Sequence, residues 1–168
     1  MAAGDAEFDR RLRERLSLVA FVANRHVLHH MQRVSRELDM DLESAFLLGT
    51  LAHLNVLSHL RPGVLPSEAL RADGIVAAPP VPVRLSQLTA VCGLPRETVR
   101  RRLLVLQEAG KVQRTAHGQW IASERGVDQR MLDFTRGTVL SLLAAADRVR
   151  ELLGPDVQPS SRLPEERQ

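Results

Sequence analysis

Hydrophobic residues near the amino terminus recur at steps of three and four, the spacing that places side chains on one face of a helix. This pattern runs from Phe8 to Leu38 without proline or glycine, and it predicts one long helix. The middle of that helix, Leu18 to Ala23, is apolar almost all round, which indicates burial on more than one side. We therefore expect the helix to contact a partner outside its own domain, most simply across a dimer seam.

A second helix is predicted directly afterwards. Asp41 can cap it, because a carboxylate at that position accepts free amide protons of the first turn, and the apolar run then continues from Leu42 to Leu60. The stretch 61–82 contains five prolines, too many for a regular element longer than a turn or two. We expect this stretch to be a connector in which Ser67 to Ala72 can form one helical turn.

Short elements separated by tight turns follow the connector. After an extended segment at Val83 to Leu85, a short helix is expected to be capped by Ser86 and to end at Gly93. A second helix is expected from Pro95 to Gly110, because proline favours a helix start and glycine readily adopts the left-handed conformation at a helix end.

The last third of the chain predicts a hairpin, a long helix and a tail. Alternating residues in Val112 to Thr115 and in Gln119 to Ala122 are typical of a small β-hairpin. Apolar residues at close to heptad spacing then predict a helix from Val127 to Leu153, the second candidate for a dimer seam. Residues 154–168 offer too little apolar surface to offset the cost of ordering, and we expect them to be disordered.

Composition narrows the classes of protein that this chain can belong to. Its 168 residues are 44% hydrophobic and 26% charged, as in an ordinary soluble domain, and no apolar run is long enough for a bilayer. The amino terminus lacks the basic and apolar stretches of a secretory signal, and Cys92 is the one cysteine. We expect a cytoplasmic protein without a membrane partner. Because no phosphate-binding loop, catalytic triad order or paired carboxylates are visible, no enzyme activity or cofactor is expected.

Residues 83–122 carry the strongest functional signal. A helix-turn-helix needs a short helix, a tight turn that glycine can make, and a second helix with an apolar inner face and an outer face for DNA. At 100° per residue, three apolar side chains fall on one side of the second helix: Val99, Leu103 and Leu106. Glu97 and Arg101 fall opposite them, so we interpret the polar side as the one that contacts duplex DNA.

Positive charge concentrates in the same segment. From Leu94 to Gly118 there are six basic residues against two acidic ones. Only the first two turns of a recognition helix reach base edges, so four residues are expected to select sequence: Arg96, Glu97, Arg100 and Arg101. Four others are expected to hold phosphates: Thr98, Arg102, Lys111 and Arg114.

The run GLPRETVRRRLLVLQEAGKV, which begins at Gly93, resembles the helix-turn-helix of winged-helix bacterial transcription regulators. Its RETVRR core is similar to the recognition helix of the cyclic-AMP receptor protein class, which implies base contacts from Arg96, Glu97 and Arg101 and a phosphate contact from Thr98. The nucleotide-binding barrel of that class is absent, because the first eighty residues are predicted to be helical.

The order of the elements resembles that of MarR-type regulators, which are dimers whose first and last helices entwine. This resemblance implies that a wing-tip residue, His117 or Arg114, enters the minor groove. We therefore expect a mainly α protein, a winged helix-turn-helix with long N- and C-terminal dimerisation helices and a small β-hairpin wing. The N-terminal helices are expected at 1–60 and the proline-rich connector at 61–82. The helix-turn-helix and wing follow at 83–122, the C-terminal dimerisation helix at 123–153 and the disordered tail at 154–168. The expected function is sequence-specific binding of double-stranded DNA by a homodimer, with no effector identified.

Two other functions stay open. A winged helix can serve instead as a surface for protein interaction. Alternatively, histidines could bind a metal or haem in a sensor, because His26 and His30 stand one helical turn apart and His53 follows on the next helix. His29 and His59 extend this set, and protonation or metal sensing is a role they could have.

Overall fold

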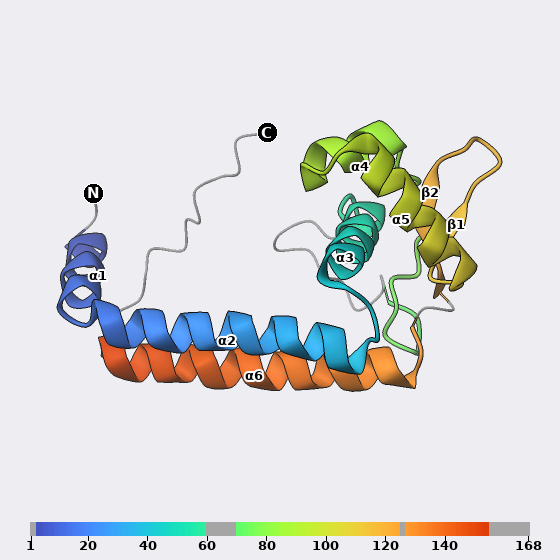
Figure 1. The fold of residues 1–168 in the computed structure, drawn as a ribbon. Coiled ribbons are helices and arrows are strands. Elements are labelled where there is room, and N and C mark those ends of the chain that lie inside the picture. The colour runs from blue at the N-terminus through green and yellow to red at the C-terminus, as the bar shows by residue number, and fades with distance from the viewer. Residues whose placement is uncertain (1–2, 60–69, 125–126, 155–168) are drawn as a thin grey trace. The chain divides into compact units, whose positions relative to one another are not determined.

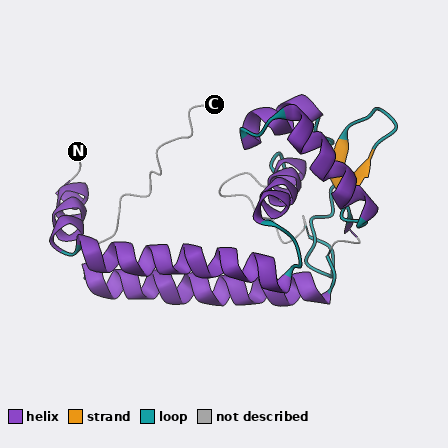
Figure 2. Ribbon diagram, viewed as in Figure 1, coloured by secondary structure: helices purple, strands orange, loops and turns teal. Residues whose placement is uncertain are grey.

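The computed structural model describes residues 3–59, 70–124 and 127–154, and side chains from Ala6 onward. These residues form six helices and a two-stranded antiparallel sheet (Figures 1 and 2), which confirms the mainly α composition and the hairpin. The chain divides into two compact units. Met1–Arg33 with Asp133–Gln168 is called the helical unit here, and Val34–Leu132 the mixed unit.

None of the helices in the described ranges is long and apolar enough to cross a membrane.

The helical unit is built from α1 (Ala3–Glu14), α2 (Leu16–Glu37) and α6 (Gln129–Leu153). The prediction of one continuous helix from Phe8 to Leu38 is wrong, because the chain turns at Arg15 between α1 and α2. Two arginines at this turn reach back to the end of α6: Arg11 Nη1 donates to the Leu153 carbonyl at 2.9 Å, and Arg15 Nη1 donates to the Leu152 carbonyl. Carbonyls at a helix end lack partners within the helix, so these guanidinium groups satisfy them and suit the negative end of the dipole.

Helices α2 and α6 lie side by side and run in opposite directions (Figure 1). The buried side chains of these two helices include Val19, Phe134 and Leu153, and the Phe134 ring of α6 lies 5.5 Å from the His30 ring of α2. Two helices can bury only the faces that meet, so much of the remaining apolar surface of this unit is open. Leu18 and Phe21, for example, are 57% and 64% exposed.

The mixed unit contains α3, α4 and α5 and the strands β1 and β2. Their bounds are Leu42–Val56, Leu85–Cys92, Arg96–Glu108, Val112–Arg114 and Trp120–Ala122. The predicted cap of α3 is confirmed, since the Asp41 carboxylate accepts from the Ser44 amide at 3.0 Å. This helix ends at Val56, earlier than predicted. Most of the predicted turn at 67–72 lies outside the described residues, as do residues 155–168 of the predicted tail.

The predicted cap of α4 is wrong. Arg84 occupies the N-cap position and Ser86 lies inside the helix, so the preceding extended segment is shorter than expected. The Gln87 side chain accepts from the Arg84 amide at 3.0 Å, which is the return bond of a capping box and not the bond that a serine cap was expected to make. Val83 is still extended and pairs with Trp120 of β2.

The core of the mixed unit lies where α3, α4, α5 and the hairpin meet. It is formed by nine buried residues: Leu47, Leu51, Val83, Leu88, Val99, Leu103, Leu106, Val112 and Trp120. Strands β1 and β2 are antiparallel, with Val112 opposite Ala122 and Arg114 opposite Trp120. Because α5 supplies three of these core residues, its orientation within the unit is fixed by packing.

One polar side chain sits inside this core. Asn55, only 1% exposed, donates from Nδ2 to the Val81 carbonyl at 2.7 Å and accepts at Oδ1 from the Ala122 amide at 2.8 Å. Its backbone carbonyl accepts from the Val81 amide at 2.8 Å. Asn55 therefore ties the end of α3 both to the segment before α4 and to β2.

Candidate nucleic-acid interface

The two sides of α5 differ as the sequence predicted. Val99 and Leu103 are fully buried and Leu106 is 3% exposed, while Glu97 and Arg101 are exposed opposite them and Arg96 and Arg100 are exposed between the two sides. This division follows from the 100° step of a helix, which sends every third or fourth side chain inward. The structure therefore leaves all four predicted base-reading residues exposed to solvent in the first two turns of α5.

A tight turn fixes α4 against α5. Gly93 ends α4 with φ of +66°, a left-handed conformation that glycine adopts without the strain of a Cβ atom, as predicted. Pro95 then stands at the N-cap of α5 rather than inside it, and Leu88 of α4 is buried in the same core as Val99. Because the turn is short and both helices share a core, the exposed side of α5 is held rigidly.

Glu97 and Arg100 are engaged with each other. Glu97 Oε1 lies 2.6 Å from Arg100 Nη2, and Arg100 Nε donates to Glu97 Oε2 at 2.9 Å. This bond lowers the pKa of the Glu97 carboxyl, with a further contribution from the charge of Arg101, and raises the pKa of Arg100. Within the described residues Arg96 and Arg101 make no ion pair.

Arg102 is positioned differently from its neighbours. It is 24% exposed, and its guanidinium donates to Asp41 Oδ2 at 2.7 Å, to the Ser44 hydroxyl at 3.1 Å and to the Glu43 carboxylate. These partners lie at the amino end of α3. The guanidinium that the sequence assigned to a DNA phosphate is therefore occupied inside the mixed unit, where it joins α5 to α3.

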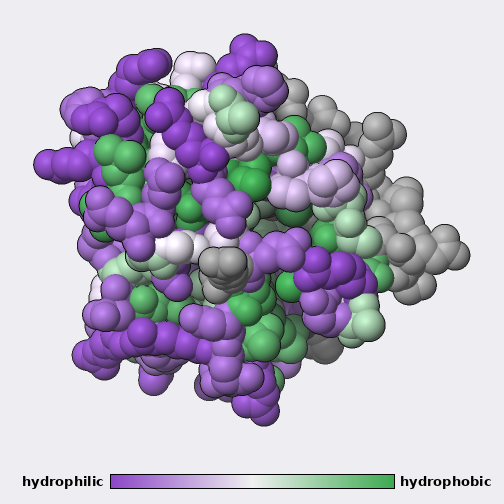
Figure 3. Space-filling view, turned by 90° about the vertical axis from the view of Figure 1, so that its right-hand side faces the viewer, coloured by the Kyte–Doolittle hydropathy of each residue, from purple (hydrophilic) through white to green (hydrophobic). Residues whose placement is uncertain are grey.

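The hairpin carries the remaining predicted residues. Arg114 Cζ lies 5.8 Å from the centre of the Trp120 ring, and Arg114 Nε is 3.5 Å from the Gly118 carbonyl oxygen. His117 is exposed at the turn between the strands, while Lys111 and Thr98 are half-buried. Figure 3 views the side on which β1 and β2 lie in Figure 1, and hydrophilic residues cover most of the surface seen there.

The histidines make different contacts. Among the residues that the structure describes, no three His, Cys, Asp or Glu side chains are grouped to hold a metal ion. His26 is 3.1 Å from the Ser141 hydroxyl, the His30 ring lies 5.5 Å from that of Phe134, and His59 is 3.2 Å from the Pro79 carbonyl. His29 and His53 are exposed on α2 and α3.

Sequence reasoning missed Asn55 and the ion pairs of Arg102. Asn55 anchors the hairpin to α3, and the one signal for it was an amide in the largely apolar segment from Leu42 to Leu60. The ion pairs of Arg102 had no signal, because their partners lie about sixty residues away in the chain.

Comparison of the chain with family models, with curated proteins and with solved structures finds no match.

Proposed function

We propose that this protein binds double-stranded DNA in a sequence-specific way, as a winged helix-turn-helix regulator that acts as a homodimer. The observation that supports it best is the two-sidedness of α5, which is anchored by buried leucines and a valine while four polar residues of its first two turns are exposed. In a helix-turn-helix, such a surface enters the major groove, and the amino-terminal turns contact base edges. The arrangement of α4, the Gly93 turn, α5 and the hairpin supports the same proposal.

The exposed residues divide by chemistry into base contacts and phosphate contacts. Arg96 and Arg101, which lack ion-pair partners in the described residues, are suited to the two acceptors of guanine. Arg100 joins them once the charge of the phosphates competes with Glu97, and Glu97 is then available to accept from cytosine.

Phosphate contacts in this proposal come from other positions. Lys111, Arg114 and Thr98 hold the backbone, and His117 lies at the tip of the hairpin where the wing meets a minor groove. Arg102 takes a structural part instead, because its guanidinium already has three partners on α3 and at its cap.

The proposed dimer forms through a charge-free face of the helical unit. This apolar face consists of one stripe from each long helix: Leu16, Ala23, Val27 and Met31 of α2, and Val139, Leu142 and Ala146 of α6. Leu16, Val27 and Leu142 are 57%, 49% and 53% exposed in the single chain. Exposed apolar stripes of this length mark interaction surfaces, and a second copy brings an equally uncharged stripe.

Selection of bound fragments from random duplex DNA tests the proposal. Enrichment of one motif with two related half-sites about one helical turn apart supports a dimer with two reading helices. On the selected duplex, Arg96→Ala and Arg101→Ala should each lose discrimination among base changes, whereas Lys111→Ala should weaken all sequences equally. Failure to enrich any motif, or identical behaviour of the three variants, contradicts it, and binding to a protein partner without DNA would favour an interaction module.

A further inference from the structure

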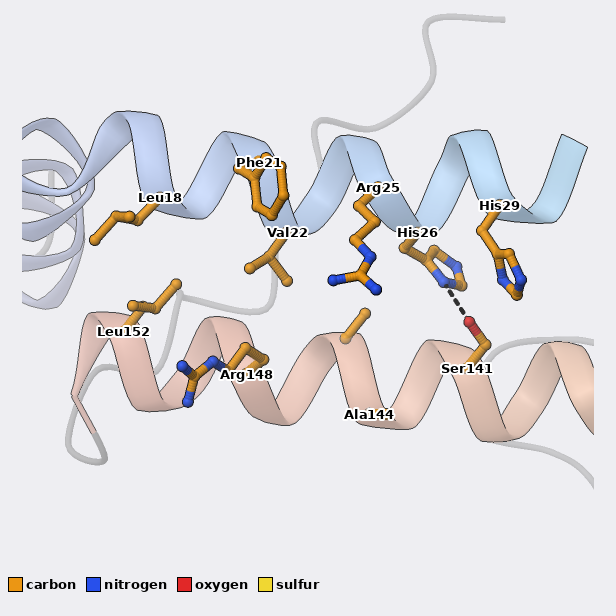
Figure 4. Close-up of a pocket in the computed structure, with 11 residues that line it drawn as sticks. Leu18, Phe21, Val22, Arg25, His26, His29, Ser141, Ala144, Arg148 and Leu152 are labelled. Carbon is orange, nitrogen blue, oxygen red and sulfur yellow. Dashed lines mark hydrogen bonds between the residues drawn. The ribbon is translucent and has the colours of Figure 1, made fainter. Parts of the chain in front are cut away.

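A groove of about 620 Å³ runs along the helical unit between α2 and α6 (Figure 4). Its walls are mainly apolar and are formed by six residues: Leu18, Phe21, Val22, Ala144, Ala145 and Leu152. This volume falls within the range of sites for small organic ligands, which combine apolar walls with a few polar groups.

The polar groups of the groove are basic or neutral. Arg25 extends from α2 toward α6, and His26, His29 and Arg148 also line the groove (Figure 4). No carboxylate is among the lining residues. Arg148 has a partner outside the groove, Glu151 at 2.6 Å, whereas Arg25 has no hydrogen-bond or ion-pair partner in the described residues.

An arginine in an apolar groove is complemented by an anion that also offers apolar surface. A carboxylate matches the planar fork of a guanidinium with two parallel hydrogen bonds. The remaining surface requires an apolar body, since Leu18 and Phe21 are both more than half exposed. The ligand class that fits both requirements is an organic carboxylate with an apolar tail.

The groove is distinct from the face that we assign to the second copy. On α2, Val27 of the apolar face lies about 180° around the helix axis from Leu18 of the groove. A second copy seated in the groove would set Arg25 and Arg148 against the same cations of its partner, with no carboxylate among the lining residues to offset them. Charge therefore favours an anionic ligand over a second chain at this position.

We propose that the groove between α2 and α6 binds a carboxylate with an apolar tail. Arg25 holds the carboxylate, with His29 beside it, and the tail lies along Phe21, Leu18 and Leu152. His26 is held by its contact with Ser141 and forms the floor near the carboxylate. This site does not rest on DNA binding, because all of its residues belong to the helical unit.

Isothermal titration of the full chain with decanoate, below its micelle-forming concentration, tests this site. Decanol supplies the tail without the charge, and acetate supplies the charge without the tail. We expect one decanoate per chain, with both controls at least tenfold weaker. Equal binding of decanol and decanoate overturns the assignment to an anion, and absence of decanoate binding overturns the site.

Variants locate the binding to the groove. Arg25→Gln should raise the Kd for decanoate about tenfold or more, as expected for loss of a charged hydrogen bond. Arg25→Lys keeps the positive charge but not the planar fork of the guanidinium, so its Kd for decanoate should lie between those of Arg25→Gln and the unchanged protein. Ala144→Phe should block the groove, and Arg36→Gln, which removes an exposed arginine of α2 outside the groove, should change nothing.

Circular dichroism checks that each variant is folded. If Ala144→Phe does not fold, the two Arg25 variants are enough to test the site. An unchanged Kd in Arg25→Gln, or an equal loss in Arg36→Gln, contradicts the proposal. Loss of decanoate binding that leaves DNA binding intact separates this inference from the proposed function. If sedimentation shows that Arg25→Gln or Ala144→Phe instead abolishes the dimer, the groove is occupied by the second copy and the ligand proposal is wrong.

Discussion

Replacement of Asn55 by leucine tests whether one buried amide holds the hairpin to α3. Leucine keeps a side chain of similar size and removes both polar atoms. The Val81 carbonyl and the Ala122 amide then lose their partners on Asn55, whereas the Trp120 carbonyl, 3.4 Å from Asn55 Nδ2, keeps its bond from the Val83 amide. Each buried backbone group left unpaired costs about 1–3 kcal/mol.

The expected loss of unfolding free energy is about 2–4 kcal/mol, because Val81 is 42% exposed and water can partly replace the bond to its carbonyl. For a unit of about 100 residues such as Val34–Leu132, a loss of about 3 kcal/mol lowers Tm by roughly 12–24 °C. Trp120 is the one tryptophan in the sequence and is 3% exposed, so its fluorescence follows unfolding of the mixed unit.

Asn24→Leu is the matched control for this measurement. Asn24 is exposed on α2 in the helical unit, so the same exchange there removes no buried hydrogen bond and should leave the fluorescence transition within about 1 °C. If Asn55→Leu also melts within about 1 °C of the unchanged protein, the bonds of Asn55 do not stabilise the mixed unit and this reasoning is refuted.

Three further changes probe separate contacts. Arg102→Ala should lower the stability of the mixed unit by about 1 kcal/mol through its two half-exposed ion pairs, whereas Arg101→Ala should leave the melting curve unchanged; equal curves would contradict the structural role of Arg102. Glu97→Gln should release Arg100 and steepen the dependence of log K on log salt by up to about 0.9 for duplex DNA, and a weaker affinity would count against the interface. Burial, and then the charges of His26 and Arg33, lower the pKa of His30, so folding favours its neutral form. The stability that this gives is complete above about pH 6.5 and should fall as the pH drops below that value. In thermal melts, Tm of His30→Gln should therefore decrease less between pH 7 and pH 5.5 than Tm of the unchanged protein.

Local patterns in the sequence were sufficient for the elements of the mixed unit. The step of three and four residues placed Val99 and Leu103 inward, and Gly93 and Gly110 adopt the left-handed conformation expected of glycine at helix ends. These features depend on neighbours a few residues apart, so periodicity and backbone preference determine them. The alternation of residues in the hairpin likewise gave the two strands.

Features that depend on distant partners could not be predicted in this way. The turn at Arg15 has neither proline nor glycine, and its arginine side chain bonds to a carbonyl of α6 that is 137 residues away in the chain. Arg102 stands next to Arg101 in a run of arginines, yet in the part of the chain that the structure describes it pairs with acidic residues at the start of α3 and Arg101 makes no ion pair. Arg25 is similar, because only the position of α6 beside α2 makes it a charged residue of a mainly apolar groove.

Salt dependence of duplex DNA binding tests the central claim most directly. Fluorescence anisotropy with a labelled selected duplex, measured from low to physiological salt, should show affinity falling linearly on logarithmic axes, because bound cations are released from phosphates. Lys111→Ala should reduce the magnitude of that slope by about one. An affinity that does not change with salt, or no binding at low salt, would contradict the claim that the exposed side of α5 contacts DNA.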